Sequence, residues 1–260
     1  MSYDTIEVSK KKDTVFVTLN RPEVHNSMNE QLMKELTNSF KDLSKDSSVR
    51  AIVLSGKGKS FCAGADLNWM KSMVNFSIEE NIKDSKLLLD LFETIYQCPK
   101  PVIGRINGHA FGGGIGLIAV CDITIAVPDL KFAFSEANLG IIPSVISTFV
   151  APRINPANMR RLFITAERFD SAVAHEIGLI DLLVSPEELD SKIKFYIEQV
   201  KSSGPEAIKE VKLLIKNLNE MNINNYKKYT VEKISELRNS KEGQNGINAF
   251  LNKTKPKWRE

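Results

Sequence analysis

Hydrophobic side chains recur at two distinct spacings along the first hundred residues. Residues 14–19 are rich in β-branched and aromatic side chains, and the wholly apolar residues 51–54 form a second short run. Both runs predict strands, the second buried on both faces. Between them, apolar residues recur every three or four positions, which predicts a helix over about residues 29–43. The same spacing predicts another helix over about residues 79–96.

The same order of elements recurs in the next stretch of the chain. A strand begins at Val102, a glycine-rich turn follows, residues 115–120 predict a buried helix, and residues 123–127 and 131–134 predict further strands. Successive β-β-α units of this kind predict a mixed α/β fold. They differ from the long strand-helix alternation of a dinucleotide-binding domain.

The end of the chain differs in character from the rest. From Pro186 onward the pattern is helical and strongly charged, and Gly204-Pro205 is a natural break between elements. We therefore predict two parts, a core over residues 1–200 and a helical region over residues 201–260.

Composition narrows the class of protein. Of 260 residues, 42% are hydrophobic and 26% are charged, which is typical of a globular protein and argues against disorder. The 35 basic and 32 acidic residues give a net charge of +3, so nothing general favours nucleic acid as a partner. The longest apolar run, residues 110–121, is too short to span a bilayer, and the first residues do not resemble a signal peptide. We expect a cytoplasmic protein without a membrane partner.

Three cysteines, Cys62, Cys98 and Cys121, lie far apart in the sequence. Their odd number and their spacing argue against a disulfide framework and against a zinc site, so we expect buried free thiols in a reducing compartment. No group of histidine, cysteine and carboxylate has the spacing of metal ligands, and we therefore predict no metal site.

Glycine is concentrated in two segments where a regular element would disfavour it. They are residues 60–67 (SFCAGADL) and residues 107–116 (NGHAFGGGIG), and the second runs into an apolar helix. Glycine in a helix costs about 1 kcal/mol relative to alanine, so this density indicates close approach to the backbone. Unpaired N–H groups at a helix start can hold a developing oxyanion. A tight turn explains either segment alone, whereas the pair favours a binding role, and neither matches a phosphate-binding loop or the dinucleotide spacing.

Further landmarks extend these two segments over nearly the whole chain. In order they are Asn20-Arg21-Pro22 with Asn26, Phe61 to Asp66, Pro101 to Gly114, Cys121-Asp122, Phe134-Ser135-Glu136, Leu139-Gly140 and Ala249 to Lys253. Together they resemble the enoyl-CoA hydratase/isomerase, or crotonase, superfamily over about residues 4–258. The resemblance implies a crotonase-like spiral of ββα units, with a C-terminal helical region that makes trimer contacts.

The resemblance also implies roles for individual residues. It assigns the amides of Ala65 and Gly113 to an oxyanion hole that holds a thioester oxygen, in agreement with the placement of glycine. The partner would be an acyl-CoA thioester, with coenzyme A as part of the substrate and no separate cofactor, bound by a homotrimer or a dimer of trimers. The residues implied to bind substrate or CoA are His25, Ser27, Ala63, Ala65, Asp66, Leu67, Asn68, Gly113, Phe250 and Lys253, the last two reaching a neighbouring subunit.

One proton-transfer group matches the family and another is missing. Family hydratases use two glutamates, and the second matches Glu136, whose apolar neighbours predict partial burial and a raised pKa. The first matches Gly116, which has no carboxylate. A single glutamate fits an isomerase that shuttles a proton, and it also fits a hydratase in which other groups hold the water. We hypothesise that Gly116 gives space to a β-branched acyl chain.

Residues 64–70, 141–149 and 165–170 are similar to a bacterial branch of methylglutaconyl-CoA and γ-carboxygeranoyl-CoA hydratases of leucine and acyclic terpene breakdown. The sequence therefore predicts a hydratase of an enoyl-CoA thioester, with 3-methylglutaconyl-CoA as the expected substrate. Arg153 and Lys71 are candidates to bind its distal carboxylate, as is His109. The alternatives are an enoyl-CoA isomerase that acts through Glu136, and a non-catalytic scaffold or RNA-binding protein of the same fold.

Overall fold

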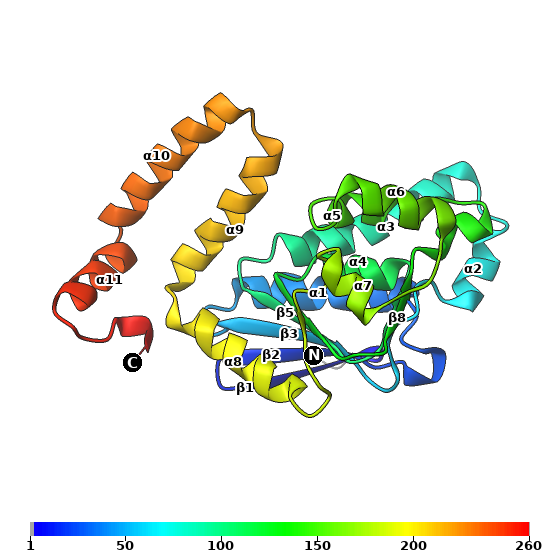
Figure 1. The fold of residues 1–260 in the computed structure, drawn as a ribbon, viewed down its shortest axis with the longest axis horizontal. Coiled ribbons are helices and arrows are strands. Elements are labelled where there is room, and N and C mark those ends of the chain that lie inside the picture. The colour runs from blue at the N-terminus through cyan, green and yellow to red at the C-terminus, as the bar shows by residue number, and fades with distance from the viewer. Residues whose placement is uncertain (1–2, 260) are drawn as a thin grey trace.

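The computed structural model describes residues 3–259 as two packed sheets with helices around them (Figure 1). The first sheet has six strands; β1 and β2 form an antiparallel hairpin and the other neighbours are parallel. In spatial order its strands are β1 (Ile6–Lys11), β2 (Thr14–Leu19), β3 (Ala51–Gly56), β5 (Val102–Ile106), β7 (Ile123–Ala126) and β10 (Leu182–Leu183).

The second sheet consists of four very short strands. In spatial order they are β4 (Ser60–Cys62), β6 (His109–Phe111), β8 (Lys131–Ala133) and β9 (Phe169–Asp170). From β3 to β8 the chain alternates between the sheets, because β3, β5 and β7 lie in the first sheet and β4, β6 and β8 in the second. The predicted mixed α/β fold of successive ββα units is confirmed.

Helices cover both faces of the six-stranded sheet. The pair α1 and α3 packs together on one side, and α8 contacts β3, β5 and β7. The helices are α1 (Glu30–Lys45), α2 (Leu67–Met73), α3 (Ile78–Tyr96), α4 (Gly113–Ala119), α5 (Ser144–Val150), α6 (Pro156–Thr165), α7 (Ser171–Glu176), α8 (Leu189–Ser202), α9 (Pro205–Glu220), α10 (Ile223–Asn239) and α11 (Lys241–Leu251), with 3-10 turns η1 (Pro22–Val24), η2 (Ser135–Leu139) and η3 (Lys257–Arg259).

Two glycine-rich segments that were not predicted as strands contain them. These are β4, in the segment 60–67, and β6, in the turn predicted after the strand that begins at Val102. Each strand has only three residues, too few to show alternation, and pairing with a distant strand stabilises it. Gly108 permits the crossing between the sheets, because a β-carbon there would lie 2.5 Å from the carbonyl oxygen of Lys59.

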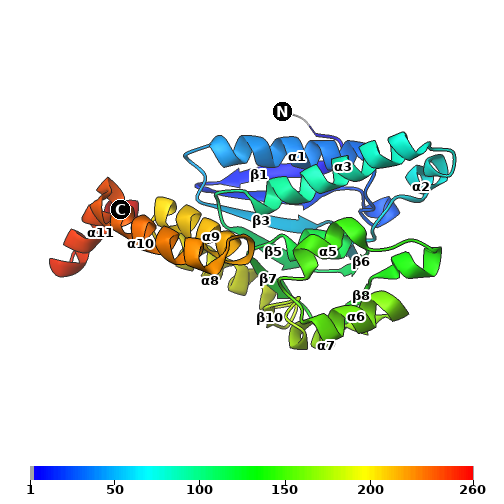
Figure 2. The same ribbon diagram turned by 90° about the horizontal axis from the view of Figure 1, so that it is seen from above.

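Helices α9, α10 and α11 form an arm that extends away from the two sheets (Figures 1 and 2). The arm begins at Pro205, directly after Gly204, where the sequence predicted a break. Glu242 of α11 accepts hydrogen bonds from the N–H groups of Glu206 (3.1 Å) and Ala207 (2.9 Å), and so caps the start of α9. Within residues 3–259 no helix is long and apolar enough to cross a membrane.

Candidate functional site

The two glycine-rich segments lie side by side because the strands that precede them are neighbours. β4 and β6 run parallel, with Ser60 opposite His109 and Cys62 opposite Ala110, so the residues after each strand emerge at the same edge. Gly64 follows β4 with φ of +86°, and a β-carbon on it would lie 2.9 Å from the carbonyl oxygen of Phe111. Only glycine fits this approach, and it brings the Ala65 region next to the start of α4.

The backbone N–H groups of Ala65 and Gly113 are free at this junction. Met28 donates its N–H to the carbonyl oxygen of Gly64 (2.7 Å), and its own carbonyl oxygen accepts the N–H of Asp66 (2.8 Å). This β-bridge does not use the N–H of Ala65, which lies between Gly64 and Asp66 in the sequence. Gly113 is the first residue of α4, whose first N–H groups have no partner inside the helix. Among the hydrogen bonds of residues 3–259, none uses either N–H. Two N–H donors are thus left free in neighbouring segments, and their action on one acceptor oxygen remains a prediction.

An ion pair between Arg21 and Asp66 holds the Ala65 segment in place. The Arg21 guanidinium donates to Asp66 Oδ2 (2.8 Å) and to the carbonyl oxygen of Ser27 (2.5 Å). The other Asp66 oxygen accepts from the N–H groups of Asn68 (2.8 Å) and Trp69 (3.3 Å) and caps α2. Burial opposes ionisation of Asp66, but the hydrogen bonds from Arg21 and the two backbone amides outweigh it and hold its pKa below the usual range. The side chain of Asp66 thus serves the loop, and its predicted contact with CoA remains a prediction.

Glu136 in η2 faces the same junction. Its Oε1 lies 3.0 Å from the point where a β-carbon on Gly112 would stand, so the carboxyl group rests against the residue before Gly113. Its Oε2 is buried and, within residues 3–259, has no hydrogen-bond partner. Burial raises the pKa of Glu136, which favours a neutral carboxyl that can deliver a proton. The predicted partial burial of this residue is confirmed.

The space beside Gly116 is closed, contrary to our hypothesis. A β-carbon on Gly116 would lie 2.7 Å from the Phe92 ring and 2.7 Å from Cγ2 of Ile146. Phe92 is fully buried and Ile146 nearly so. The expectation that Gly116 makes room for a branched acyl chain is therefore wrong, because two core side chains already fill that room.

His25 and Ser27, which the resemblance implies bind substrate or CoA, lie next to the Ala65 segment. His25 accepts the N–H of Ala63 at its carbonyl oxygen (3.0 Å), and its Nδ1 lies 3.1 Å from Ser60 Oγ. Ser27 is buried, whereas Leu67 is 74% exposed and Asn68 is exposed. The buried amide of Asn26, whose two donor hydrogen bonds reach the carbonyls of Lys57 and Ser60, fixes this turn. The structure brings this group together, and its contact with CoA remains a prediction.

Phe250 and Lys253 are not brought to the site within one chain. Phe250 lies on α11 at the far end of the arm, with 83% of its surface exposed, and Lys253 follows α11 (Figure 1). Helices α2, which follows Ala65, and α4, which begins at Gly113, lie in the core on the opposite side of α9 from α11 (Figures 1 and 2). The predicted contact of Phe250 and Lys253 with the CoA of a neighbouring subunit remains a prediction.

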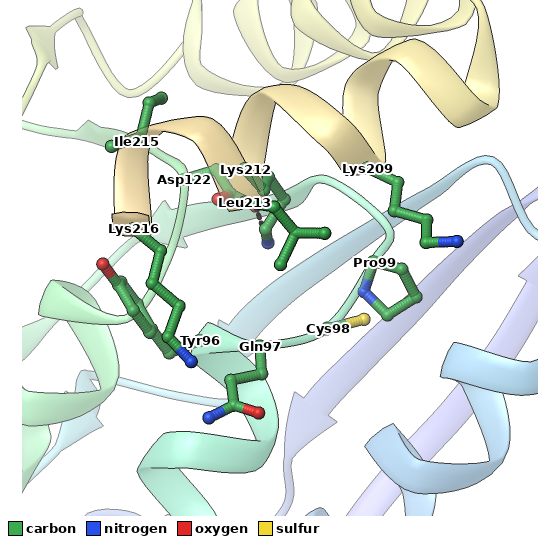
Figure 3. A pocket seen from close by; sticks show the side chains of 10 residues that line it. All are labelled: Tyr96, Gln97, Cys98, Pro99, Asp122, Lys209, Lys212, Leu213, Ile215 and Lys216. Carbon is green, nitrogen blue, oxygen red and sulfur yellow. Dashed lines mark hydrogen bonds and ion pairs between the residues drawn. The ribbon is translucent and has the colours of Figure 1, made fainter. Parts of the chain in front are cut away.

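A separate cavity of about 170 Å³ lies where the arm joins the core (Figure 3). Residues around the end of α3, together with one face of α9, form its walls. Asp122, which closes one side, pairs with Lys212 Nζ at 2.6 Å. Asp122 follows the last turn of α4, whereas Gly113 begins that helix. The cavity is thus at the opposite end of α4 from the free N–H groups.

Other candidate groups have structural roles. The three cysteines are free and buried, as predicted, and burial raises the pKa of Cys62 and Cys121 to about 12, so neither forms a thiolate at neutral pH. His109 lies in β6, where its Nδ1 accepts the N–H of Lys131 (3.0 Å). Within residues 3–259 no three histidine, cysteine or acidic side chains gather as a metal site.

Sequence reasoning missed the packing residues of the site. Phe92 belongs to an apolar helical pattern and Met28 directly precedes another, so both resemble ordinary core residues, and Arg21 belongs to the Asn20-Arg21-Pro22 landmark. No local signal marks Phe92 as a neighbour of Gly116. Arg21 and Asp66 carry opposite charges, but 45 positions separate them, so the sequence alone does not indicate that they pair.

Comparisons with known proteins agree with this geometry. The sequence model of the family described as enoyl-CoA hydratase/isomerase matches residues 9–260. The short-chain-enoyl-CoA hydratase of Clostridium acetobutylicum is 32% identical over 98% of this chain and 97% of its own. The peroxisomal Delta(3,5)-Delta(2,4)-dienoyl-CoA isomerase of Arabidopsis thaliana is 30% identical over 99% of this chain and 98% of its own.

The fold is shared as well. The crystal structure of an enoyl-CoA hydratase from Shewanella pealeana superposes with a TM-score of 0.95 at 34% identity, over 98% of this chain and 96% of that one. The two-sheet spiral with its helical C-terminal region is therefore the crotonase fold. With the family match along almost its whole length, the chain belongs to the enoyl-CoA hydratase/isomerase (crotonase) superfamily.

Proposed function

We propose that this enzyme adds water reversibly to an enoyl-CoA thioester. The observation that carries the proposal is the position of the Glu136 carboxyl against Gly112, beside Gly113. Among residues 3–259, neither Glu136 Oε2 nor the N–H of Gly113 has a hydrogen-bond partner. The N–H groups of Ala65 and Gly113 would bind the thioester oxygen. Glu136 would transfer the proton.

The chemistry follows from these three groups. Two N–H donors on the thioester oxygen stabilise the enolate-like transition state that forms when hydroxide adds to the β-carbon, and one such donor contributes roughly 3 to 4 kcal/mol in comparable sites. The attacking water gives its hydroxyl to the β-carbon and its proton to the carboxylate form of Glu136. A proton from the Glu136 carboxyl then reaches the α-carbon, so the carboxyl ends as it began. The raised pKa of Glu136 makes its neutral form easier to reach than that of an exposed glutamate, which suits this exchange.

Isomerisation of the double bond is the second candidate. It is favoured by the apolar side chains of Phe92 and Ile146 beside Gly116, which leave Glu136 as the carboxyl at this junction. One carboxyl can remove a proton from one carbon and return it to another without water. The same three residues would act, with the N–H groups stabilising a dienolate.

The predicted substrate, 3-methylglutaconyl-CoA, is part of the proposal and rests on the sequence resemblance alone. Of the candidates for its distal carboxylate, Arg153 is engaged elsewhere: its Nε donates to the carbonyl oxygen of Ala119 (3.0 Å), and its guanidinium also bonds the carbonyl of Cys121 and lies 3.6 Å from Asp181. Lys71 is exposed on α2. We also propose a cytoplasmic enzyme and a homotrimer or dimer of trimers, the latter supported by exposed apolar residues on the arm such as Val231 and Ile234.

One experiment tests these alternatives together. The purified enzyme is incubated with crotonyl-CoA, a 3-enoyl-CoA and 3-methylglutaconyl-CoA, and the products are weighed by mass spectrometry. Hydration adds the mass of one water, whereas isomerisation leaves the mass unchanged and shifts the double bond. Faster hydration of crotonyl-CoA than of 3-methylglutaconyl-CoA contradicts the substrate assignment. Absence of any turnover, with CoA binding retained, supports a non-catalytic protein.

A further inference from the structure

The side chains that face the start of α4 form a closed apolar wall, made of Met28, Phe92 and Ile146. Gly113 and Gly116 are three residues apart and so share one face of the helix. A β-carbon on Gly113 would lie 2.1 Å from Met28 Cε and 4.0 Å from Phe92 Cζ. A β-carbon on Gly116 would lie 2.7 Å from the same Phe92 atom. The tip of one ring therefore fills the space along both glycines.

This ring is fixed in position. Phe92 packs edge-on against Phe149 with 5.8 Å between ring centroids, and Phe149 packs edge-on against Tyr96 at 5.6 Å. Phe92 and Tyr96 are one turn apart on α3, so they hold the Phe149 ring of α5 between them. All of Phe92 is buried. A ring in such a cluster keeps its place when a ligand arrives.

The wall also borders the reacting groups. Gly113 has the free N–H, and the neighbouring Gly112 touches the Glu136 carboxyl. An acyl group whose carbonyl oxygen is held at Gly113 would approach the Phe92 ring, since a β-carbon on Gly113 would lie 4.0 Å from Phe92 Cζ.

We propose that Phe92 is a specificity-determining residue, which closes the space beside Gly116 and so limits the width of an acyl group held at Gly113. The inference deepens the proposed function and rests on it, because it assumes that an acyl-CoA occupies this junction. A side chain shorter than phenylalanine at position 92 opens a space next to the acyl carbons. A methyl group added at Gly116 refills part of that space from the opposite side.

The test compares a straight and a branched substrate in matched variants. The wild type, Phe92→Leu, Phe92→Leu with Gly116→Ala, and Phe40→Leu are assayed with crotonyl-CoA and 3-methylcrotonyl-CoA. Phe92→Leu is expected to raise the ratio of kcat/KM for the branched over the straight thioester about tenfold, the scale that one methyl group commands in an apolar pocket. The added Gly116→Ala is expected to return the ratio toward the wild-type value. Phe40→Leu removes an equally buried ring and is expected to leave the ratio unchanged.

Equal ratios in Phe92→Leu and Phe40→Leu, or no reversal by Gly116→Ala, overturn the proposal. Should Phe92→Leu lack a cooperative thermal transition, Ile146→Val removes one methyl from the same wall and gives the same test with a change of a few fold. Calorimetric measurement of the binding of butyryl-CoA and isovaleryl-CoA tests the role of Phe92 separately from the proposed reaction. If the wild type turns over no thioester, the proposed reaction fails, while a changed ratio of the two dissociation constants in Phe92→Leu still supports the role of Phe92.

Discussion

The carboxyl group of Glu136 lies directly against the backbone of Gly112, with Oε1 3.0 Å from the point where a β-carbon would stand. Gly112 has φ of +48° and ψ of −120°, a conformation that L side chains rarely adopt. It donates its N–H to the carbonyl oxygen of Ala133 (3.0 Å), which ties it to β8, the strand that precedes Glu136. The acid and the first N–H of α4 are thus fixed to one another through one glycine.

This relationship predicts that Gly112→Ala lowers activity through position rather than through stability alone. The new methyl group stands 3.0 Å from Glu136 Oε1 and shifts the carboxyl by a few tenths of an ångström. Because a displacement near 1 Å at such a site can cost about 100-fold in rate, we expect a loss of up to about tenfold. Gly140→Ala is the matched control, since Gly140 has φ of +74° but no atom within 4 Å of its β-carbon position. Both variants lose about 1 to 2 kcal/mol of stability from the strained backbone. Turnover and chemical unfolding are measured on both; equal losses of turnover contradict the positional argument.

Glu136→Gln is expected to abolish proton transfer while it keeps the shape of the site. General acid-base groups contribute about 10²- to 10⁴-fold, so kcat should fall by that range. Binding of CoA thioesters, measured by calorimetry, should stay within a few fold, because the N–H groups of Ala65 and Gly113 are unchanged. Normal turnover by this variant would show that Glu136 is not the proton-transfer group.

The raised pKa of Glu136 predicts the sign of a stability difference. Folding favours the neutral carboxyl, so the native state binds more protons than the unfolded chain once the pH exceeds the ordinary value of 4.5. Stability of the wild type therefore falls as the pH rises from there to the raised pKa, and the penalty is constant above it. Glu136→Gln has no such charge and should gain stability relative to the wild type over this window. Urea unfolding of both proteins from pH 4 to pH 8 measures the difference, which should shrink toward zero at pH 4.

The elements that the sequence predicted are those with a long local pattern. The helix over 29–43 and the strand over 14–19 became α1 and β2, because their burial repeats within the segment itself. β4 and β6 could not be predicted, since three residues show no period and the pairing of Ser60 with His109 depends on the whole fold. The sequence shows that Gly116 has no side chain, but it does not show that the ring of Phe92, 24 positions earlier, fills the space beside it. Local pattern thus located the site, and long-range packing determined its shape.

The Arg21–Asp66 ion pair is expected to contribute more to the free energy of unfolding than exposed ion pairs with a similar N–O distance. Both side chains are mostly buried, and removal of one partner leaves the other charge without compensation, which costs about 3 to 5 kcal/mol for buried pairs and somewhat less here. Arg21→Gln should therefore lower the free energy of unfolding by about 2 to 4 kcal/mol and weaken CoA binding, because the Ala65 loop loosens. Lys34→Gln, which breaks the exposed pair with Glu30, should cost below about 0.5 kcal/mol. Urea unfolding of the two variants distinguishes the roles.

The cap that Glu242 forms on α9 predicts how the arm is held. Its carboxylate accepts two N–H groups at the positive end of the helix, where such a cap contributes about 0.5 to 2 kcal/mol. The absence of a side chain at Gly204 leaves room for this carboxylate, since a β-carbon there would lie 2.2 Å from Glu242 Oε1. Glu242→Ala should raise hydrogen exchange at the amides of Glu206 and Ala207 by about 10-fold and leave exchange in β3 unchanged. Glu236→Ala, which removes an exposed partner of Lys233 on α10, controls for loss of charge on the arm. Uniform acceleration across arm and core in Glu242→Ala would mean that the cap stabilises the whole fold rather than the junction.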